Sequence, residues 1–200
     1  MPASNLDSVH TSGSTAASGD TFGDPRVDTA TLRRMAAANA TALVLGYLPM
    51  ARWEQRMRAT GGPGIVGLQL ARDTGVARAI LSTWGVEGRR AATEQTWADF
   101  VWMQTYGITG AYVVELARRR AAPASGWARA GRVVRWLPHA AVACDVVEGV
   151  GQLRTLRSWQ DPGEGTVRMT RVAATAKYAL LGAAALWAVG AATIGARRPE

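Results

Sequence analysis

Residues 172–194 read VAATAKYALLGAAALWAVGAATI, and Lys177 is the only charged residue among these 23. A helix on the surface of a soluble protein needs a polar face along its length, and this stretch has none. At about 1.5 Å per residue, the stretch is long enough to cross the ~30 Å hydrocarbon layer of a bilayer. It therefore predicts a membrane-spanning helix that ends before Arg197 and Arg198.

Three earlier stretches have the same character, with arginine and tryptophan at or near their ends, as at membrane–water interfaces. Over the whole chain of 200 residues, only 19% are charged, against about 25% in ordinary soluble domains. The alternative is a soluble helical bundle with buried helices, which the acidic residues inside the stretches favour. We predict an all-α fold, a polytopic membrane four-helix bundle, with helices at about 35–51, 97–116, 136–153 and 172–194.

The rest of the chain divides into a tail and one long connection. Residues 1–30 are rich in small and polar residues and predict a disordered tail, which leaves 31–200 as the transmembrane domain. Between the first two helices, segment 62–85 mixes apolar and charged residues. It predicts one or two short helices that lie on the membrane interface or pack against the bundle, with a structured loop as an equal alternative.

The net charge of +8 would indicate nucleic acid as a partner of a soluble protein. Here the arginines lie between apolar stretches, which favours membrane lipids and no nucleic acid as partners. Six arginines between Arg118 and Arg135 form the densest cluster. Because short basic loops stay in the cytoplasm, we expect a multi-pass protein of the cell membrane with both termini cytoplasmic.

Ionisable side chains inside the predicted helices indicate a site, since each costs roughly 3 kcal/mol at mid-membrane. Antiparallel threading places Asp99, Asp145, Glu148 and Lys177 in one half of the bilayer, on the side of the long connection. Asp145 and Glu148 are three residues apart and share a helix face. Two adjacent carboxylates in a dry site do not both ionise readily, so one should hold a proton near neutrality.

Lys177 is the only lysine among 23 basic residues, which indicates a specific role. We predict that it pairs with Asp145 or Glu148, and the alternative is that it extends to the lipid headgroups. A purely structural reading, in which these acids only tie helices together, stays open. The candidate site comprises the acids Asp99, Asp145 and Glu148 with Tyr106, and the ligand-binding residues Gln104, Trp102, Trp187 and Lys177.

A resemblance rests on several short motifs. Leu68-Gln69-Leu70-Ala71, Ala79-Ile80-Leu81, Trp84-Gly85, Asp99-Phe100, Tyr106-Gly107 and Asp145-x-x-Glu148 together resemble a family of small four-helix bacterial integral membrane proteins, over about residues 40–190. The resemblance implies a four-helix fold and a role for Asp99, Tyr106, Asp145 and Glu148, and it implies no reaction. In that family Asn often follows the acid pair, whereas this chain has Gly149.

Two classes of function follow. In the first, the acidic pocket binds a lipophilic ligand or relays protons, or the protein is an accessory subunit of a membrane complex. In the second, it is an acid–base membrane enzyme of the isomerase or terpenoid cyclase type that acts on an isoprenoid-like substrate, with Trp102, Tyr106 and Trp187 stabilising a carbocation. No metal or cofactor is predicted, because a phosphate-binding loop and a zinc-ligand motif are both lacking from the sequence.

Overall fold

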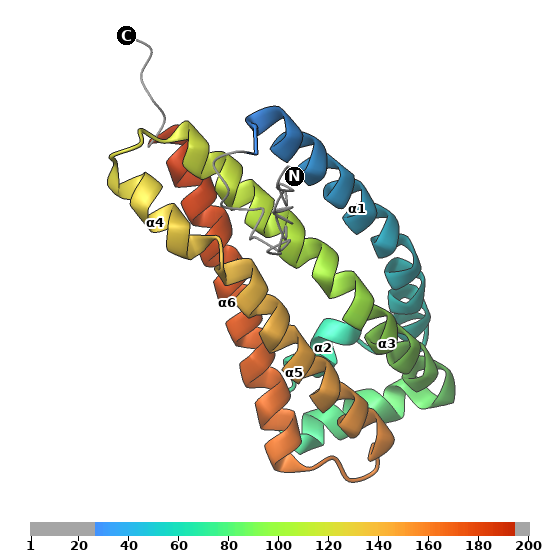
Figure 1. Cartoon of the computed structure of the whole chain (residues 1–200). Coiled ribbons are helices and arrows are strands. Elements are labelled where there is room, and N and C mark those ends of the chain that lie inside the picture. The colour runs from blue at the N-terminus through green and yellow to red at the C-terminus, as the bar shows by residue number, and fades with distance from the viewer. Residues whose placement is uncertain (1–26, 195–200) are drawn as a thin grey trace, which may run out of the picture.

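The structure, a computed structural model, describes residues 27–194, which form α-helices and contain no β-strand. Long helices α3, α5 and α6 pack lengthwise, and α1 lies along α3 (Figure 1). The fold is therefore all-α, as predicted. The helices are α1 (Thr29–Ala59), α2 (Ile65–Gln69), α3 (Thr74–Arg120), α4 (Gly126–Val134), α5 (Leu137–Arg157) and α6 (Glu164–Thr193).

Local sequence signals explain where α1 begins and ends. The Asp28 carboxylate accepts hydrogen bonds from the backbone N–H groups of Ala30 at 2.8 Å and Thr31 at 2.9 Å. The Thr31 bond in particular holds the pKa of Asp28 below its ordinary value. At the other end Gly61 has φ of 86°, a left-handed conformation that suits glycine and ends the helix.

Each of the four predicted spans coincides with part of a long helix, namely α1, α3, α5 or α6. The third span begins one residue before α5, and the fourth ends one residue after α6. Helices α1, α3 and α6 extend well beyond the predicted apolar stretches. The charged turns next to each stretch continue the same pattern of backbone hydrogen bonds. Helix α4 lies in the connection before α5 and was not predicted, since nine residues are too few for a clear apolar period. The predicted tail 1–30 lies largely outside the described residues.

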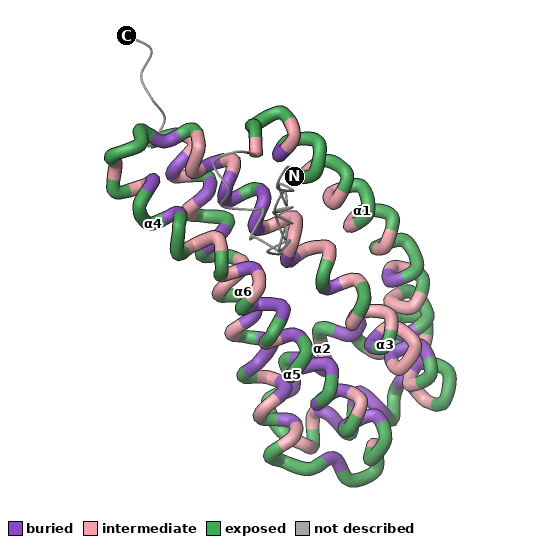
Figure 2. The backbone as a smooth tube through the Cα atoms, viewed as in Figure 1, coloured by how far each residue is buried: buried purple, intermediate pink, exposed green. Residues whose placement is uncertain are grey.

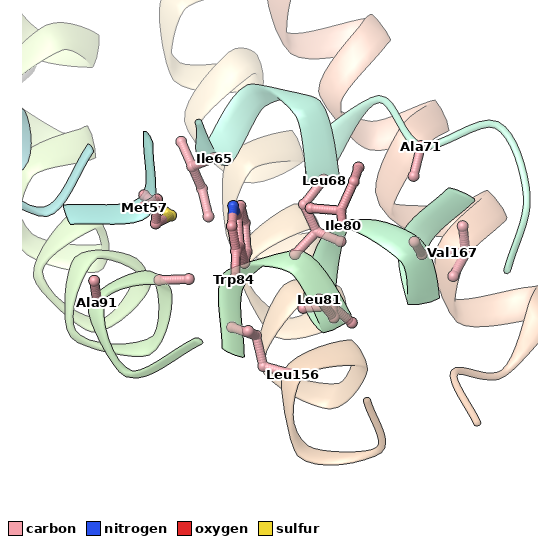
Figure 3. Packing of buried hydrophobic residues seen from close by; sticks show 12 residues of the cluster. Met57, Ile65, Leu68, Ala71, Ile80, Leu81, Trp84, Ala91, Leu156 and Val167 are labelled. Atoms are coloured by element: carbon pink, nitrogen blue, oxygen red, sulfur yellow. The ribbon is translucent and has the colours of Figure 1, made fainter. Parts of the chain in front are cut away.

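Segment 62–85 packs against the bundle, one of the two arrangements predicted for it. It forms α2 and the first turns of α3, and Trp84 and Leu81 are at most 1% exposed. Figure 3 shows these side chains in one apolar cluster with Met57 of α1, Leu156 of α5 and Val167 of α6. The Trp84 indole N–H also donates to the Pro63 carbonyl at 2.7 Å. With Ile65 and Leu68 of α2, the cluster joins five helices at one end of the molecule.

Gly85 bends α3 directly after Trp84, so that residues of α3 before and after the bend contribute to this cluster. Its φ of 58° and ψ of −158° are not helical. Only glycine reaches this region without strain, because a Cβ atom would crowd the backbone. The bend turns the first part of α3 across the end of the bundle (Figure 1).

One helix of the described chain, α6, is long and apolar enough to cross a membrane, with a mean hydropathy of 1.5 over its most apolar stretch. Only 28% of that stretch is buried inside the molecule, and Figure 2 shows exposed residues along the helix. The other three predicted spans do not meet the same combination of length and hydropathy. Charged residues within and beside them lower their hydropathy, so the four-span prediction is not confirmed.

Helix α1 packs chiefly against α3 and stands away from α5 and α6. Trp102 of α3 fixes its position, since the indole N–H donates to the Leu43 carbonyl at 2.9 Å. Gly46 permits the approach, because a Cβ atom there would lie 2.5 Å from the Trp102 ring. This placement leaves a cleft between α1 and α6.

Replacing Gly85 by alanine should destabilise the fold by about 1–2 kcal/mol, because alanine cannot adopt this conformation without strain. Gly182 is the matched control. Both glycines have open space where a Cβ would be built, and only Gly85 has a positive φ. Gly182→Ala should therefore be neutral or stabilise helix α6 by up to about 1 kcal/mol. Thermal unfolding of the purified variants, followed by circular dichroism, measures the two changes in stability. Equal changes would contradict the left-handed conformation of Gly85.

Candidate functional site

Lys177 lies at the centre of a buried ionic cluster in the middle of α6. Its Nζ atom is 2.7 Å from Oδ1 of Asp145 and 2.8 Å from Oε2 of Glu148, both on α5. The side chains are 7%, 2% and 0% exposed respectively, so water contributes little to their solvation. The predicted pairing of Lys177 is confirmed, and it includes both acids rather than one.

The remaining carboxylate oxygens bind neutral donors. The Tyr106 hydroxyl of α3 donates to Oδ2 of Asp145 at 2.7 Å. The Gln152 amide, one turn beyond Glu148 on α5, donates to Oε1 of Glu148 at 2.8 Å. Each partner compensates for part of the solvation that the buried carboxylate has lost. The cluster thereby ties α3, α5 and α6 together.

Asp99 is the third carboxylate of the cluster and differs from the other two. It interacts electrostatically with Asp145 and Lys177, yet its side chain has no hydrogen bond or ion pair within residues 27–194. It is partly exposed and lines a cavity. The three predicted acids are thus together in space, and one of them has acceptor atoms available to a ligand.

The cavity has a volume of about 830 Å³, within the range of roughly 300–1,000 Å³ for small-molecule sites. It occupies the cleft between α1 and α6, with α3 behind it and α2 at one end. Its polar wall holds Asp99, Asp145, Tyr106 and Lys177. The apolar lining comes from α1, α2 and α6: Leu43, Val44, Met50, Ile65, Val66 and Leu181.

Trp102 lines this cavity as predicted, whereas Gln104 and Trp187 do not. Gln104 is exposed, because five residues after Asp99 a helix has turned about 140° beyond a full turn. Trp187 lies about 15 Å along α6 from Lys177, ten residues away. It packs against Trp127 of α4, with ring centroids 6.2 Å apart. Predicted ligand roles for these two residues have no support from the geometry.

Several pocket residues were missed. Gln152 continues the face defined by Asp145 and Glu148, so helical spacing alone was enough to find it. Tyr178 donates its hydroxyl to Gln69 of α2 at 2.9 Å, and this contact holds α2 at the end of the cavity. No local signal in the sequence brings α2 to α6.

In the described part of the chain, no group of three or more His, Cys, Asp or Glu side chains is suited to hold a metal ion. Comparisons with protein-family models, with curated proteins and with solved structures found no match for this chain. The inferences below therefore rest on the geometry of the site.

Replacing Lys177 by methionine should destabilise the protein by about 3–5 kcal/mol, because Asp145 and Glu148 are left facing each other without a cation. The double variant Lys177→Met/Glu148→Gln should lose far less than the sum of the two single variants. Chemical denaturation of the purified protein measures the cycle.

An exposed ion pair on the same protein provides the control. Arg78 and Asp161 are 3.2 Å apart, with side chains 50% and 95% exposed. A cycle on this pair should give almost no coupling, because water screens exposed charges. Additive losses at Lys177 and Glu148 would contradict the buried pairing.

Proposed function

We propose that this protein spans a membrane with four helices and that the cleft between α1 and α6 binds a lipophilic ligand. The observation that carries the proposal is the combination of an apolar cavity of about 830 Å³ with a buried ionic cluster on its inner wall. Buried charges are expensive, and in membrane proteins they mark sites for ligands or protons. Apolar walls suit a ligand that enters from lipid.

The outward faces of the long helices support the membrane location. Leu186 and Val189 of α6 are 76% and 62% exposed, and Val101 of α3 is 75% exposed. On α1 the neighbouring residues Val44, Leu45 and Leu48 are each at least 58% exposed. Soluble monomers rarely expose contiguous apolar surface on this scale. A bilayer would cover these faces.

The positions of the helix ends agree with an even number of crossings. The start of α1 and the end of α6 lie at the same end of the bundle, near α4 (Figure 1). The arginine cluster between Arg118 and Arg135 is at this end too, so we propose that it faces the cytoplasm. Membership of the family of small four-helix bacterial membrane proteins is part of the same proposal.

The cleft opens sideways rather than along the bundle. Val44 and Tyr47 line the cavity from α1 and are 64% and 55% exposed, and Val66 of α2 is 43% exposed. With α1 separated from α6, the opening between them would face the acyl chains of the bilayer. A ligand would then reach the ionic cluster without crossing the headgroup layer.

A second candidate is the acid–base enzyme, and the position of Asp99 favours it. A protonated Asp99 carboxyl would give its proton to an olefin in the cavity, and loss of a neighbouring C–H proton to the same carboxylate would complete an isomerisation. Trp102 and Tyr106, with ring centroids 5.9 Å apart, line the same cavity. Their faces would stabilise the intermediate cation.

Membrane integration predicts that alkaline carbonate leaves the full-length protein in the pellet of isolated membranes. Carbonate removes proteins that are held at the surface by charge, whereas spanning helices stay in the bilayer. A known peripheral protein in the same preparation should appear in the supernatant. Release of this protein into the supernatant would overturn the membrane proposal.

Filling the cavity should weaken the binding of a lipophilic probe. Leu181 lines the cavity, and Leu186 lies on the same helix outside it and is 76% exposed. We expect Leu181→Trp to weaken pyrene binding to the solubilised protein at least about tenfold, because the larger ring occupies the cavity. Leu186→Trp should bind pyrene as the unaltered protein does. The saturable change in pyrene fluorescence is the measurement.

The pair of variants also controls for the added tryptophan, since both add one and only one of them fills the cavity. Equal binding by both variants, or no saturable binding by the unaltered protein, would contradict a ligand site in this cleft.

A further inference from the structure

The ionic cluster leaves one group free to meet a ligand, and that group is Asp99. Both oxygens of Asp145 have partners, namely Lys177 and Tyr106. Both oxygens of Glu148 also have partners, namely Lys177 and Gln152. Within residues 27–194 the Asp99 side chain has no such partner, and it lies on the cavity wall. A ligand in the cavity therefore meets a hydrogen-bond acceptor.

Among the residues that the structure describes, Lys177 supplies the one cation of the inner wall, and it is enclosed. The Lys177 ammonium contacts Asp145 and Glu148 and lies 4.9 Å from the centre of the Tyr178 ring. At the rim, Arg58 is 2.7 Å from Glu54, so this pair is balanced. An anionic headgroup would find no uncompensated cation on the part of the lining formed by residues 27–194.

Acidic groups outnumber basic groups at the inner wall. Asp99 and Asp145 line the cavity and Glu148 is fully buried behind it, so three carboxyl groups surround the single ammonium of Lys177. In a site of low polarity these carboxyl groups do not all ionise on their own, and a cation beside Asp99 would stabilise its ionised form. The wall therefore favours a positively charged group on the ligand.

Trp102 and Tyr106, on the same helix as Asp99, offer ring faces rather than donors. The Trp102 N–H and the Tyr106 hydroxyl are already bonded to Leu43 and Asp145. The rings of Tyr47 and Tyr106 lie 6.3 Å and 5.9 Å from that of Trp102, centre to centre. Aromatic faces attract ammonium groups, most strongly where water is excluded.

We infer that the ligand is a lipophilic cation, an apolar body with an ammonium group that binds between the Asp99 carboxylate and the ring of Trp102. This inference rests on the proposed function, because it names the class of ligand for the same cavity. The apolar body would occupy the part of the cleft between Leu43 of α1 and Leu181 of α6. No covalent step is involved.

Displacement of pyrene from the solubilised full-length protein tests the inference with three ligands of equal chain length: dodecylamine, dodecanol and dodecanoate. The unaltered protein should bind dodecylamine at least about tenfold more tightly than dodecanol, and dodecanoate most weakly. Asp99→Asn should remove the preference for dodecylamine over dodecanol while pyrene itself still binds. Within residues 27–194 the side chain at this position has no hydrogen bond or ion pair to lose, so the variant should fold.

Glu87→Gln is the matched control, because it removes one acid from the same helix at a side chain that is 73% exposed and outside the cavity. It should keep the preference for dodecylamine. Equal displacement by the three ligands, or a preference that survives Asp99→Asn, would overturn the inference and leave the lipophilic cavity intact. If pyrene does not bind, or if its binding does not change in Leu181→Trp, the proposed function is overturned instead.

Discussion

The Lys177 ammonium between Asp145 and Glu148 is the interaction on which the arrangement of the bundle depends. Three buried charges are tolerated only when their atoms approach within about 3 Å and the remaining oxygens have donors. The observed distances of 2.7 Å and 2.8 Å meet this condition. A slide of α5 along α6 by one turn, about 5.4 Å, would separate all three. The cluster therefore fixes the register of these two helices.

The same constraint extends to α3 and shapes the cavity. Because Tyr106 must reach Asp145, the face of α3 that carries Asp99 and Trp102 also turns toward the cleft. Trp102 in turn holds α1 through the Leu43 carbonyl. Helix α1 is thus attached to α3 and kept apart from α6. The cavity is the space that this chain of contacts leaves open. The buried ionic cluster lies on its inner wall, and apolar side chains of α1, α2 and α6 form much of the rest of its lining.

Helical spacing and antiparallel order were enough to predict part of the site. Asp145 and Glu148 share a face because three residues make nearly one turn, and the depth of Lys177 in its helix matches theirs. The same reasoning was too coarse for Gln104 and Trp187. A polar or aromatic residue at a suitable depth still points away from the site when its angle around the helix is wrong. Depth follows from residue number, whereas the angle relative to a neighbouring helix depends on packing.

The sequence by itself determined the four long helices, since apolar runs bounded by arginines have few other solutions. It also predicted an acidic partner for the lone lysine, with the lipid headgroups as the alternative, and the tertiary structure decided for the acids. The tertiary structure decided the bend at Gly85, the return of α2 against α6 and the separation of α1 from α6. Each of these depends on contacts between residues far apart in the chain, such as Tyr178 with Gln69. The cavity follows from such contacts, and no local pattern encodes it.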